Sequence, residues 1–285
     1  MQRLPKISPY ADVLEHLADS LAAKWRSCGK ELKRCRKNFS KSAVHDTRIT
    51  TRRLLSTLEL IGPFVSKSRV RKIARSLKEF LDGFSEVRDT HVQLEHVKQF
   101  RQFAAARPFK KWLQKRDAKF SRQARKAVKK FDTRKLGRRI AALEQEVRDC
   151  RQANVSPHAV AVVLLSVDRL YLLVAELLRH IRTDDTKTIH CTRIAFKHFR
   201  YAVEELGSIL GAVTPARCEQ MRAYQSRMGD IQDMEVFLQA FDAYAGRKKV
   251  DAAPAEKFRR EIQRRLQRLI EKFLREADKL NDFRL

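Results

Sequence analysis

The sequence contains one long internal repeat, which constrains the fold more than any other feature. VHDTRITTRRLLSTLELIG (44–62) aligns with IHCTRIAFKHFRYAVEELG (189–207), so that His190 follows His45 by 145 residues. FLDGFSEVRDTHVQLEHV (80–97) aligns with YQSRMGDIQDMEVFLQAF (224–241) at an offset of 144 residues. We call the first pair the histidine blocks and the second pair the aspartate blocks. Two blocks in one order at almost one spacing predict two similar halves with approximate twofold symmetry.

Both halves are expected to consist of helices. Only 8 Gly and 7 Pro occur among 285 residues, residues with high helix propensity dominate, and no strand or hairpin pattern is present. The segment 151–157 contains the loop-forming residues Asn, Ser and Pro and is the predicted boundary, so the halves cover about 1–150 and 151–285. Ser42 is the expected N-cap of the second helix. The expected helices are 9–37, 42–62, 69–106 with a break near Gly83, 108–131, 138–150, 157–182, 185–211, 215–245 and 254–280.

The net charge sets the expected class of partner. Lys and Arg outnumber Asp and Glu by 62 to 34, which gives a formal net charge of +28. Such an excess repels itself in a folded chain, so it predicts association with a polyanion, namely inorganic polyphosphate, nucleic acid or an anionic membrane surface. A basic solvated surface with no specific partner is the alternative.

Several features of the sequence favour a cytoplasmic location. The 5 cysteines are scattered and form neither a Cys-x-x-Cys pair nor a metal-ligand spacing with histidine, which is typical of reduced thiols. The N-terminal segment lacks the continuous apolar stretch of a signal peptide. No run approaches the roughly 18 apolar residues of a membrane-spanning helix.

Each histidine block carries a cationic stripe when it is placed on a helix. The stripe falls on one narrow arc at about 100° per residue, beside an apolar arc that suits a core. Its positions are His45, Arg48, Arg52 and Glu59 in the first block and His190, Arg193, Lys197 and Glu204 in the second. A solvated face needs charge but no match between positions, so the recurrence favours a shared binding role. A buried ion network in which the glutamates neutralise the arginines is the alternative.

A metal site is not expected, although His45-Asp46 is a pair with which many metal phosphohydrolase sites begin. Neighbouring residues on a helix point about 100° apart, and the second block has His190-Cys191 instead. The surrounding cations would also repel a divalent ion, whereas a bound anion would favour protonation of both histidines. Neither a nucleophile–base pair nor a glycine-rich phosphate loop is evident. We therefore expect no catalysis, no metal and no other cofactor.

Four motifs follow one another along the chain. They are His45-x-x-Arg48-x-x-x-Arg52-Arg53, Val87-Arg88-Asp89-x-x-Val92, His190-x-x-Arg193-x-x-x-Lys197-x-x-Arg200-Tyr201-x-x-Glu204 and Met228-Gly229-Asp230-Ile231-Gln232-Asp233. Together they resemble the CHAD domain family, an α-helical family marked by a recurring histidine, and the resemblance covers essentially the whole chain. The sequence departs from the family pattern at Phe84-Ser85, where Leu-Gly is usual, and at His198, which stands where the first block has Arg53.

The resemblance implies an all-α fold in which two pseudo-symmetric helical bundle halves surround a central basic pocket or pore. It also implies non-catalytic binding of inorganic polyphosphate and, in bacteria, association with polyphosphate granules. Many members of the family carry a triphosphatase-type domain before the helical one. Because this sequence starts directly with the helical part, we expect that activity to be missing.

Polyphosphate offers only charge and oxygen acceptors, so its receptor should be an array of arginine and lysine side chains. The expected polyphosphate-binding residues are His45, Arg48, Arg52, Arg53, Arg88, His190, Arg193, Lys197, Arg200 and Tyr201, with Arg71, Arg75 and Lys78 as second-rank candidates. Asp89 and Asp233 are expected to cap helices or orient arginines rather than to act as acids or bases.

Two alternatives to polyphosphate binding remain at this stage. Sequence-nonspecific nucleic-acid binding fits the charge, but no zinc-finger spacing, aromatic strand motif or basic-zipper heptad is present. A basic scaffold protein is the other alternative, with the segment 122–139 or the final helix docking on acidic partners or dimerising. For the final helix we favour core packing, because Ile262, Leu266, Leu269, Phe273 and Leu280 recur at helical core spacing. The oligomeric state is left open.

Overall fold

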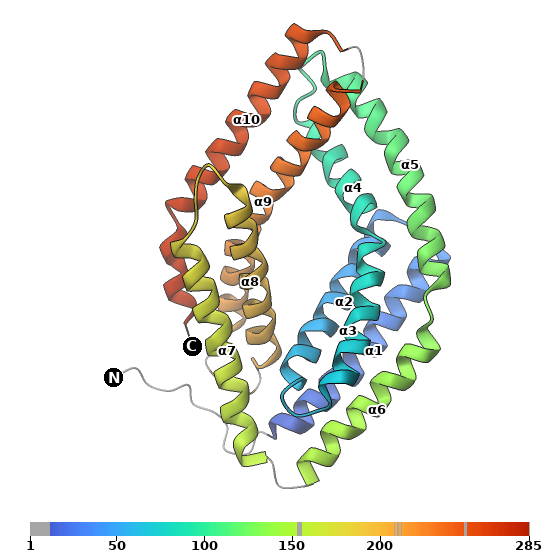
Figure 1. Cartoon of the computed structure of the whole chain (residues 1–285), viewed down its shortest axis with the longest axis vertical. Helices are drawn as coiled ribbons and strands as arrows, with labels where there is room; N and C mark the ends of the chain where they lie inside the picture. The colour runs from blue at the N-terminus through green and yellow to red at the C-terminus, as the bar shows by residue number, and fades with distance from the viewer. Residues whose placement is uncertain are drawn as a thin grey trace.

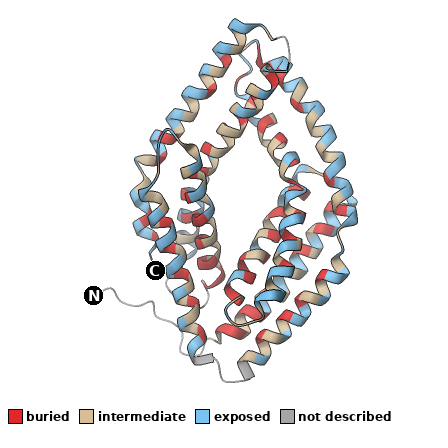
Figure 2. Ribbon diagram, in the orientation of Figure 1, coloured by how far each residue is buried: buried red, intermediate tan, exposed pale blue. Residues whose placement is uncertain are grey.

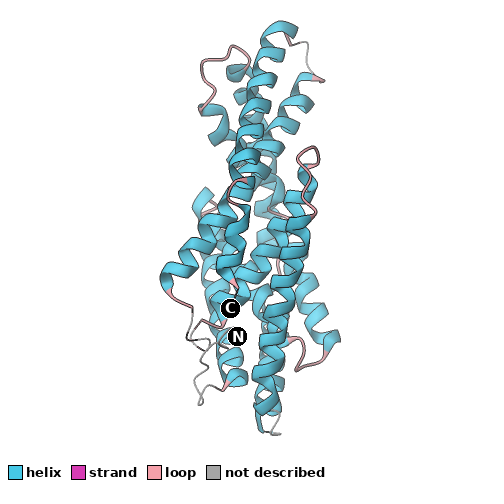
Figure 3. Cartoon of the chain, turned by 90° about the vertical axis from the view of Figure 1, so that its left-hand side faces the viewer, coloured by secondary structure: helices cyan, strands magenta, loops and turns pink. Residues whose placement is uncertain are grey.

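The computed structural model describes residues 12–152, 156–207, 209, 211, 213–247 and 250–284. Within these residues the regular elements are helices, which confirms the all-α class (Figure 1 and Figure 3). They are α1 (Val13–Lys37), α2 (Lys41–Ile61), α3 (Lys67–Asp82), α4 (Ser85–Lys98), α5 (Ala106–Lys130), α6 (Thr133–Gln152), α7 (Ser156–Arg179), α8 (Thr186–Glu205), α9 (Pro215–Ala245), α10 (Ala252–Leu274) and the 3₁₀ helix η1 (Ala277–Phe283).

Polar side chains determine where several helices begin. The Ser40 hydroxyl accepts a hydrogen bond from the backbone N–H of Ala43 at 3.2 Å, and the Thr214 hydroxyl caps α9 in the same way. The prediction of Ser42 as the N-cap of α2 is therefore wrong, because Ser40 already satisfies the first turn. The expected start of the first helix at residue 9 lies outside the described residues.

Other helix boundaries also differ from the sequence-based expectation. α4 ends at Lys98 rather than at residue 106, because the turns that follow it bury Phe100 and Ala105 in the core. α6 begins at Thr133 rather than at residue 138, because the Asp132 carboxylate accepts a hydrogen bond from the N–H of Lys135 at 2.9 Å. α7, α8 and α10 each end several residues earlier than expected.

The predicted break near Gly83 is confirmed. A Cβ at Gly83 would meet the carbonyl oxygen of Phe80 at 3.3 Å and the Cβ of Ala127 at 3.4 Å, so glycine lets the α3–α4 junction lie close against α5. The junction is tight although Phe84-Ser85 replaces the usual Leu-Gly. In the second aspartate block, by contrast, α9 runs without a break.

The repeated blocks meet their own repeats in space. The histidine blocks lie on α2 and α8, which pack against each other, and α4 of the first aspartate block packs against α9 of the second. These two contacts link the group α1–α6 to the group α7–α10 (Figure 1). The pairing fits the predicted symmetry, but the pseudo-symmetry and the division at residue 150 stay predictions.

Apolar side chains hold both groups together, with the buried positions on the inward helix faces (Figure 2). The largest core cluster includes Leu17 and Leu54 from the first group and Phe196 and Tyr224 from the second. A second cluster packs the aromatic rings of α5, α9 and α10 around Phe109, and each such ring pair adds about 0.5–1.5 kcal/mol beyond burial. The expected core packing of the final helix is confirmed: Ile262, Phe273 and Leu280 are buried, and Leu266 and Leu269 pack against the core.

Candidate functional site

The two histidine blocks enclose a cavity of about 300 Å³ between α2 and α8. Its floor is completed by the end of α3 and the start of α4. Its charged and polar lining consists of Arg48, Arg52, Ser56, Glu59, Lys78, Asp82, Ser85, Lys197, His198 and Tyr201. The cavity therefore contains cations from both copies of the repeat.

A second cavity of about 570 Å³ shares two of these arginines. Arg48 and Arg52 line it together with Arg88 and His91 of α4 and with Lys41 and His45 of α2. The guanidinium groups of Arg48 and Arg52 therefore line both cavities. An extended ligand that passes from one cavity to the other would contact both arginines.

In the part of the chain that the structure describes, three cations in or beside these cavities form no ion pair. Arg52 and Lys197 line the first cavity, whereas Arg193 lines neither cavity and lies beside Arg52. Within the described residues, Arg52, Arg193 and Lys197 form no hydrogen bond and no ion pair, and all three are partly buried. Burial lowers the pKa of Arg52 and of Arg193, and the nearby charge of Arg88 lowers both further. Unpaired cations that repel one another in a half-buried position are poised to accept an anion.

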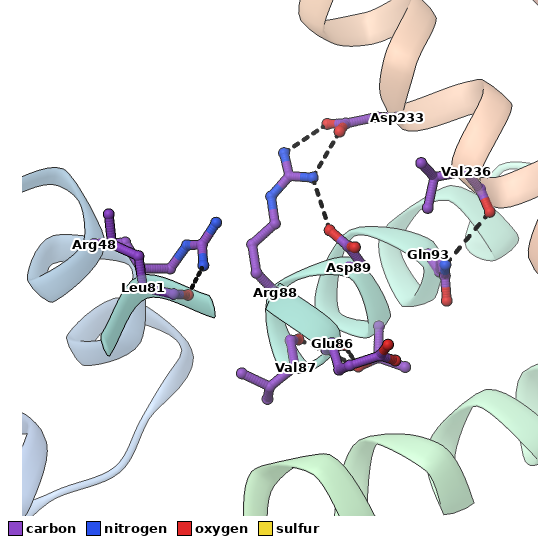
Figure 4. A network of polar contacts seen from close by, with 10 residues as sticks. Arg48, Leu81, Glu86, Val87, Arg88, Asp89, Gln93, Asp233 and Val236 are labelled. Atoms are coloured by element: carbon purple, nitrogen blue, oxygen red, sulfur yellow. Dashed lines mark hydrogen bonds and ion pairs between the residues drawn. The ribbon is translucent and has the colours of Figure 1, made fainter. Parts of the chain in front are cut away.

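Arg48 and Lys197 are the cations of this site whose pKa values are lowered most. Burial, reinforced by Arg52 and Arg193, lowers the pKa of the Lys197 ammonium to about 8. Burial, reinforced by Arg52 and Arg88, lowers the pKa of Arg48 to about 10. Arg48 also has a structural contact, because its Nη1 donates to the carbonyl oxygen of Leu81 at 3.2 Å (Figure 4). That bond adds to the one that the same carbonyl oxygen accepts from the N–H of Phe84 at 3.0 Å, and so ties Arg48 to the end of α3.

Arg88 differs from these cations because it is paired. Its Nη1 and Nη2 donate to the two carboxylate oxygens of Asp233 at 2.7 and 3.0 Å, and Nη1 also lies 3.2 Å from Asp89 (Figure 4). Burial opposes the charge of Arg88, but the bonds to Asp233 outweigh it and raise its pKa. Asp233 thus orients an arginine, as expected. Neither aspartate caps a helix, because both lie inside one.

Arg193 lies against the backbone of α9 at Gly229. A Cβ at Gly229 would be 3.8 Å from the Nε of Arg193, and nothing else lies within 4 Å. The glycine of the motif therefore leaves room for a guanidinium group beside the helix. The Ser85 that replaces it in the first block lines the cavity.

Arg200 and Tyr201 are neighbours in sequence but differ in their contacts. Arg200 is only 6% exposed, and its guanidinium donates to Gln225 at 2.9 Å and to Glu204 at 2.6 Å. It also lies 4.4 Å from the centre of the Tyr201 ring. The structure thus uses Arg200 to join α8 to α9, whereas Tyr201 lines the first cavity.

The remaining arginine and lysine candidates are spread over the surface. Arg53 is exposed and lines a third cavity of about 280 Å³ with Lys24, Glu204 and Glu205. Lys78 is exposed but belongs to the first cavity. Arg71 and Arg75 are exposed on α3 and line none of the three cavities at the histidine blocks.

The two histidines at equivalent positions of the repeat, His45 and His190, have different surroundings. His45 is exposed at the second cavity. His190 is half-buried with its Nδ1 unpartnered, and burial together with Arg193 lowers its pKa. His190 is therefore neutral in the free protein at neutral pH, and the predicted gain of a proton would require an anion.

His91 also lines the second cavity but was not predicted from the sequence, although it follows Arg88 by three positions and so shares its helix face. Lys41 lines the same cavity, but it precedes the first histidine block and belongs to no motif, so no sequence pattern indicated it.

The glutamates of the stripe form no ion pair with Arg52, Arg193 or Lys197 within the described residues. Glu59 nevertheless lies close enough to Lys197 to oppose the lowering of its pKa. Glu59 contacts His198 at 2.7 Å, and Glu204 contacts Arg200 and Arg222. The buried ion network expected as the alternative therefore forms, but around Arg200 rather than around Arg52 and Arg193. This leaves the charge of the first cavity available for a ligand.

Among the residues that the structure describes, no group of three His, Cys, Asp or Glu side chains could hold a metal ion. None of the helices in the described part of the chain is long and apolar enough to cross a membrane.

Comparison with known proteins identifies the fold and the family. The chain matches the crystal structure of the CHAD domain from the plant Ricinus communis with a TM-score of 0.74 and 16% identity, over 100% of this chain and 98% of that one. It matches PptA from Streptomyces chartreusis with a TM-score of 0.68 and 15% identity, over 94% of this chain and 100% of that one. No curated protein matches the sequence. The model of the CHAD domain matches residues 16–242, and the chain therefore belongs to the CHAD domain family.

Proposed function

We propose that the protein binds inorganic polyphosphate without hydrolysing it, and that the chain lies across the two cavities that share Arg48 and Arg52. The observation that carries the proposal is the pair of unpaired, half-buried cations Arg52 and Lys197, which line the first cavity from the two histidine blocks, with Arg193 unpaired beside them. Membership of the CHAD domain family supports it as well.

The chemistry of the lining suits a linear polymer of phosphates. Each phosphate supplies negative charge and oxygen acceptors, and guanidinium groups bind such oxygens with two parallel hydrogen bonds. Binding replaces the mutual repulsion of the cations by attraction, so the free energy stored in the unoccupied site favours the complex. Because the guest offers no bases to recognise, no base-stacking platform is required.

We further propose that the site does not cleave its ligand. Phosphoryl transfer generally relies on divalent cations held beside the reacting phosphate. The cations around Arg52 would repel such ions rather than collect them. A protein that holds polyphosphate in this way could attach to polyphosphate granules in the cytoplasm, which we propose as its location.

Titration with polyphosphate of defined length tests the proposal, on protein freed of co-purified polyanions. We expect log affinity to fall steeply and linearly with log salt concentration, because several phosphate contacts release counterions. Short polyphosphate should displace bound DNA or RNA completely. DNA that resists an excess of polyphosphate would instead support the nucleic-acid alternative, and a weak salt dependence would contradict the charge-array mechanism.

A further inference from the structure

The solvent face of α5 carries an unbroken excess of positive charge. Every exposed position of this helix is Lys or Arg except Pro108, Gln114, Ala118 and Gln123. The one acidic residue of α5, Asp117, is half-buried and contacts His91 of α4 at 3.2 Å. In the part of the chain that the structure describes, no carboxylate forms an ion pair with the exposed cations of this helix.

The exposed cations of α10 show that this is not a general property of the surface. There Arg264 and Arg268 both contact Glu261, at 3.1 and 3.3 Å, and Arg260 contacts Glu256 at 2.8 Å. Arg260, Arg264 and Arg268 of α10 are thus each paired with a carboxylate of the same helix, as is common on a solvated face. The exposed cations of α5 are left for a partner.

The length of α5 and the spacing of its lysines favour one kind of polyanion. The helix has 25 residues and is therefore about 37 Å long. Lys111, Lys115 and Lys119 follow each other at four-residue intervals, about 6 Å apart along the axis. A straight row of this kind can follow an extended, flexible chain of phosphates.

Duplex nucleic acid fits this surface less well. The opposite face of α5 is packed into the core through Phe109, Leu113 and Val128. The helix also forms an outer edge of the molecule, packed on α4 (Figure 1). Only one face of α5 is therefore open to a partner, and its exposed side chains are mostly Lys and Arg, so a duplex would be held through phosphate contacts rather than through its bases.

We propose that the solvent face of α5 is a second polyphosphate-binding surface, so that one protein molecule holds two chains at once and bridges long chains into larger assemblies. No residue of α5 lines the three cavities at the histidine blocks, so the two surfaces are separate. This inference rests on the proposed function, because it takes the same polymer as the ligand. Bridging requires two independent sites on one molecule and no further change in the protein.

Paired variants test the second surface. The first replaces Lys111, Lys115 and Lys119 of α5 by Gln, and the matched control replaces Arg260, Arg264 and Arg268 of α10 by Gln. Both remove three positive charges and keep good helix formers. Equilibrium dialysis with short polyphosphate counts the chains bound per protein, and light scattering with long polyphosphate measures bridging. We expect two bound chains and strong scattering for the unchanged protein and the α10 variant. For the α5 variant we expect one bound chain and scattering no greater than that of single polyphosphate chains that carry bound protein.

Equal losses in both variants, or two bound chains in the α5 variant, would overturn the inference. So would duplex DNA that binds the α5 face and is not displaced by polyphosphate. The double change Arg52→Gln and Arg193→Gln separates this inference from the proposed function. If it leaves both bound chains in place, the central site is wrong while the α5 surface stands. If the only bound chain disappears with Arg52 and Arg193, the central site stands and the α5 surface is wrong.

Discussion

Arg88 and Asp233 are joined by two parallel hydrogen bonds across 145 positions of the sequence. Each belongs to one aspartate block, so the bond ties α4 to α9 beside the cavities. Their side chains are 31% and 17% exposed, which keeps the pair largely shielded from solvent screening. Arg88 thus lines the second cavity with its charge already balanced, unlike Arg52.

Asp233→Asn should lower the stability of the protein but raise its affinity for polyphosphate. We expect the free energy of unfolding to fall by about 1–3 kcal/mol, because a charged hydrogen-bond partner is lost and Arg88 is left facing other cations. Polyphosphate affinity should rise, because Arg88 becomes free to bind phosphate. Chemical denaturation and polyphosphate titration measure the two effects, and a fall in affinity would show instead that Asp233 holds Arg88 in its binding position.

Arg52→Gln and Arg193→Gln should each lower polyphosphate affinity by about tenfold or more, the value of a charged hydrogen bond to phosphate. Their unfolding free energy should not fall, because each removes a cation that its neighbours repel. Arg53→Gln is the matched control, since it deletes the adjacent charge on the exposed side of α2. An equal loss of affinity at Arg53 would point to net charge rather than to the cavity.

The pKa of Lys197 predicts a pH dependence of binding. Its amine is protonated below about pH 8 in the free protein, and a bound phosphate favours the protonated form and raises that pKa. Affinity should therefore be full below pH 8 and decline as pH rises above it, because binding must then take up a proton. The Lys197→Arg variant stays charged, so its titrations on either side of pH 8 should give a flatter profile. Equal slopes for both proteins would contradict this assignment.

Gly229 offers a test of the close approach to Arg193. Gly229→Ala should raise the free energy of unfolding by about 0.5–1 kcal/mol, because alanine favours the helix and its Cβ meets only Arg193 at an ordinary contact distance of 3.8 Å. Gly229→Leu should displace the guanidinium group and weaken polyphosphate binding. Thermal denaturation and titration of both variants check the pair of effects, and unchanged binding in the leucine variant would show that Arg193 does not need this position.

Sequence patterns were sufficient for the helices and for the family. The spacing of apolar residues, the capping residues and the scarcity of Gly and Pro act over a few positions, so they predict most elements to within a few residues. The break at Gly83 was predictable for the same reason. The end of α4 was not, because its following turns are held by Phe100 in a core assembled from distant helices.

The histidine-block stripe identified the right helix faces, but the tertiary structure decided which cations remain free. A helical periodicity gives the direction of a side chain around its own axis and says nothing of the groups that meet it from other helices. Arg200 is neutralised by Glu204 of its own helix and donates a hydrogen bond to Gln225 of α9. Arg88 is neutralised by Asp233 of α9. Within the residues that the structure describes, Arg52 and Arg193 form no ion pair, although Asp89 and Asp233 lie near enough to act on their charge. This difference arises because ion pairing depends on distance in space rather than on distance along the chain.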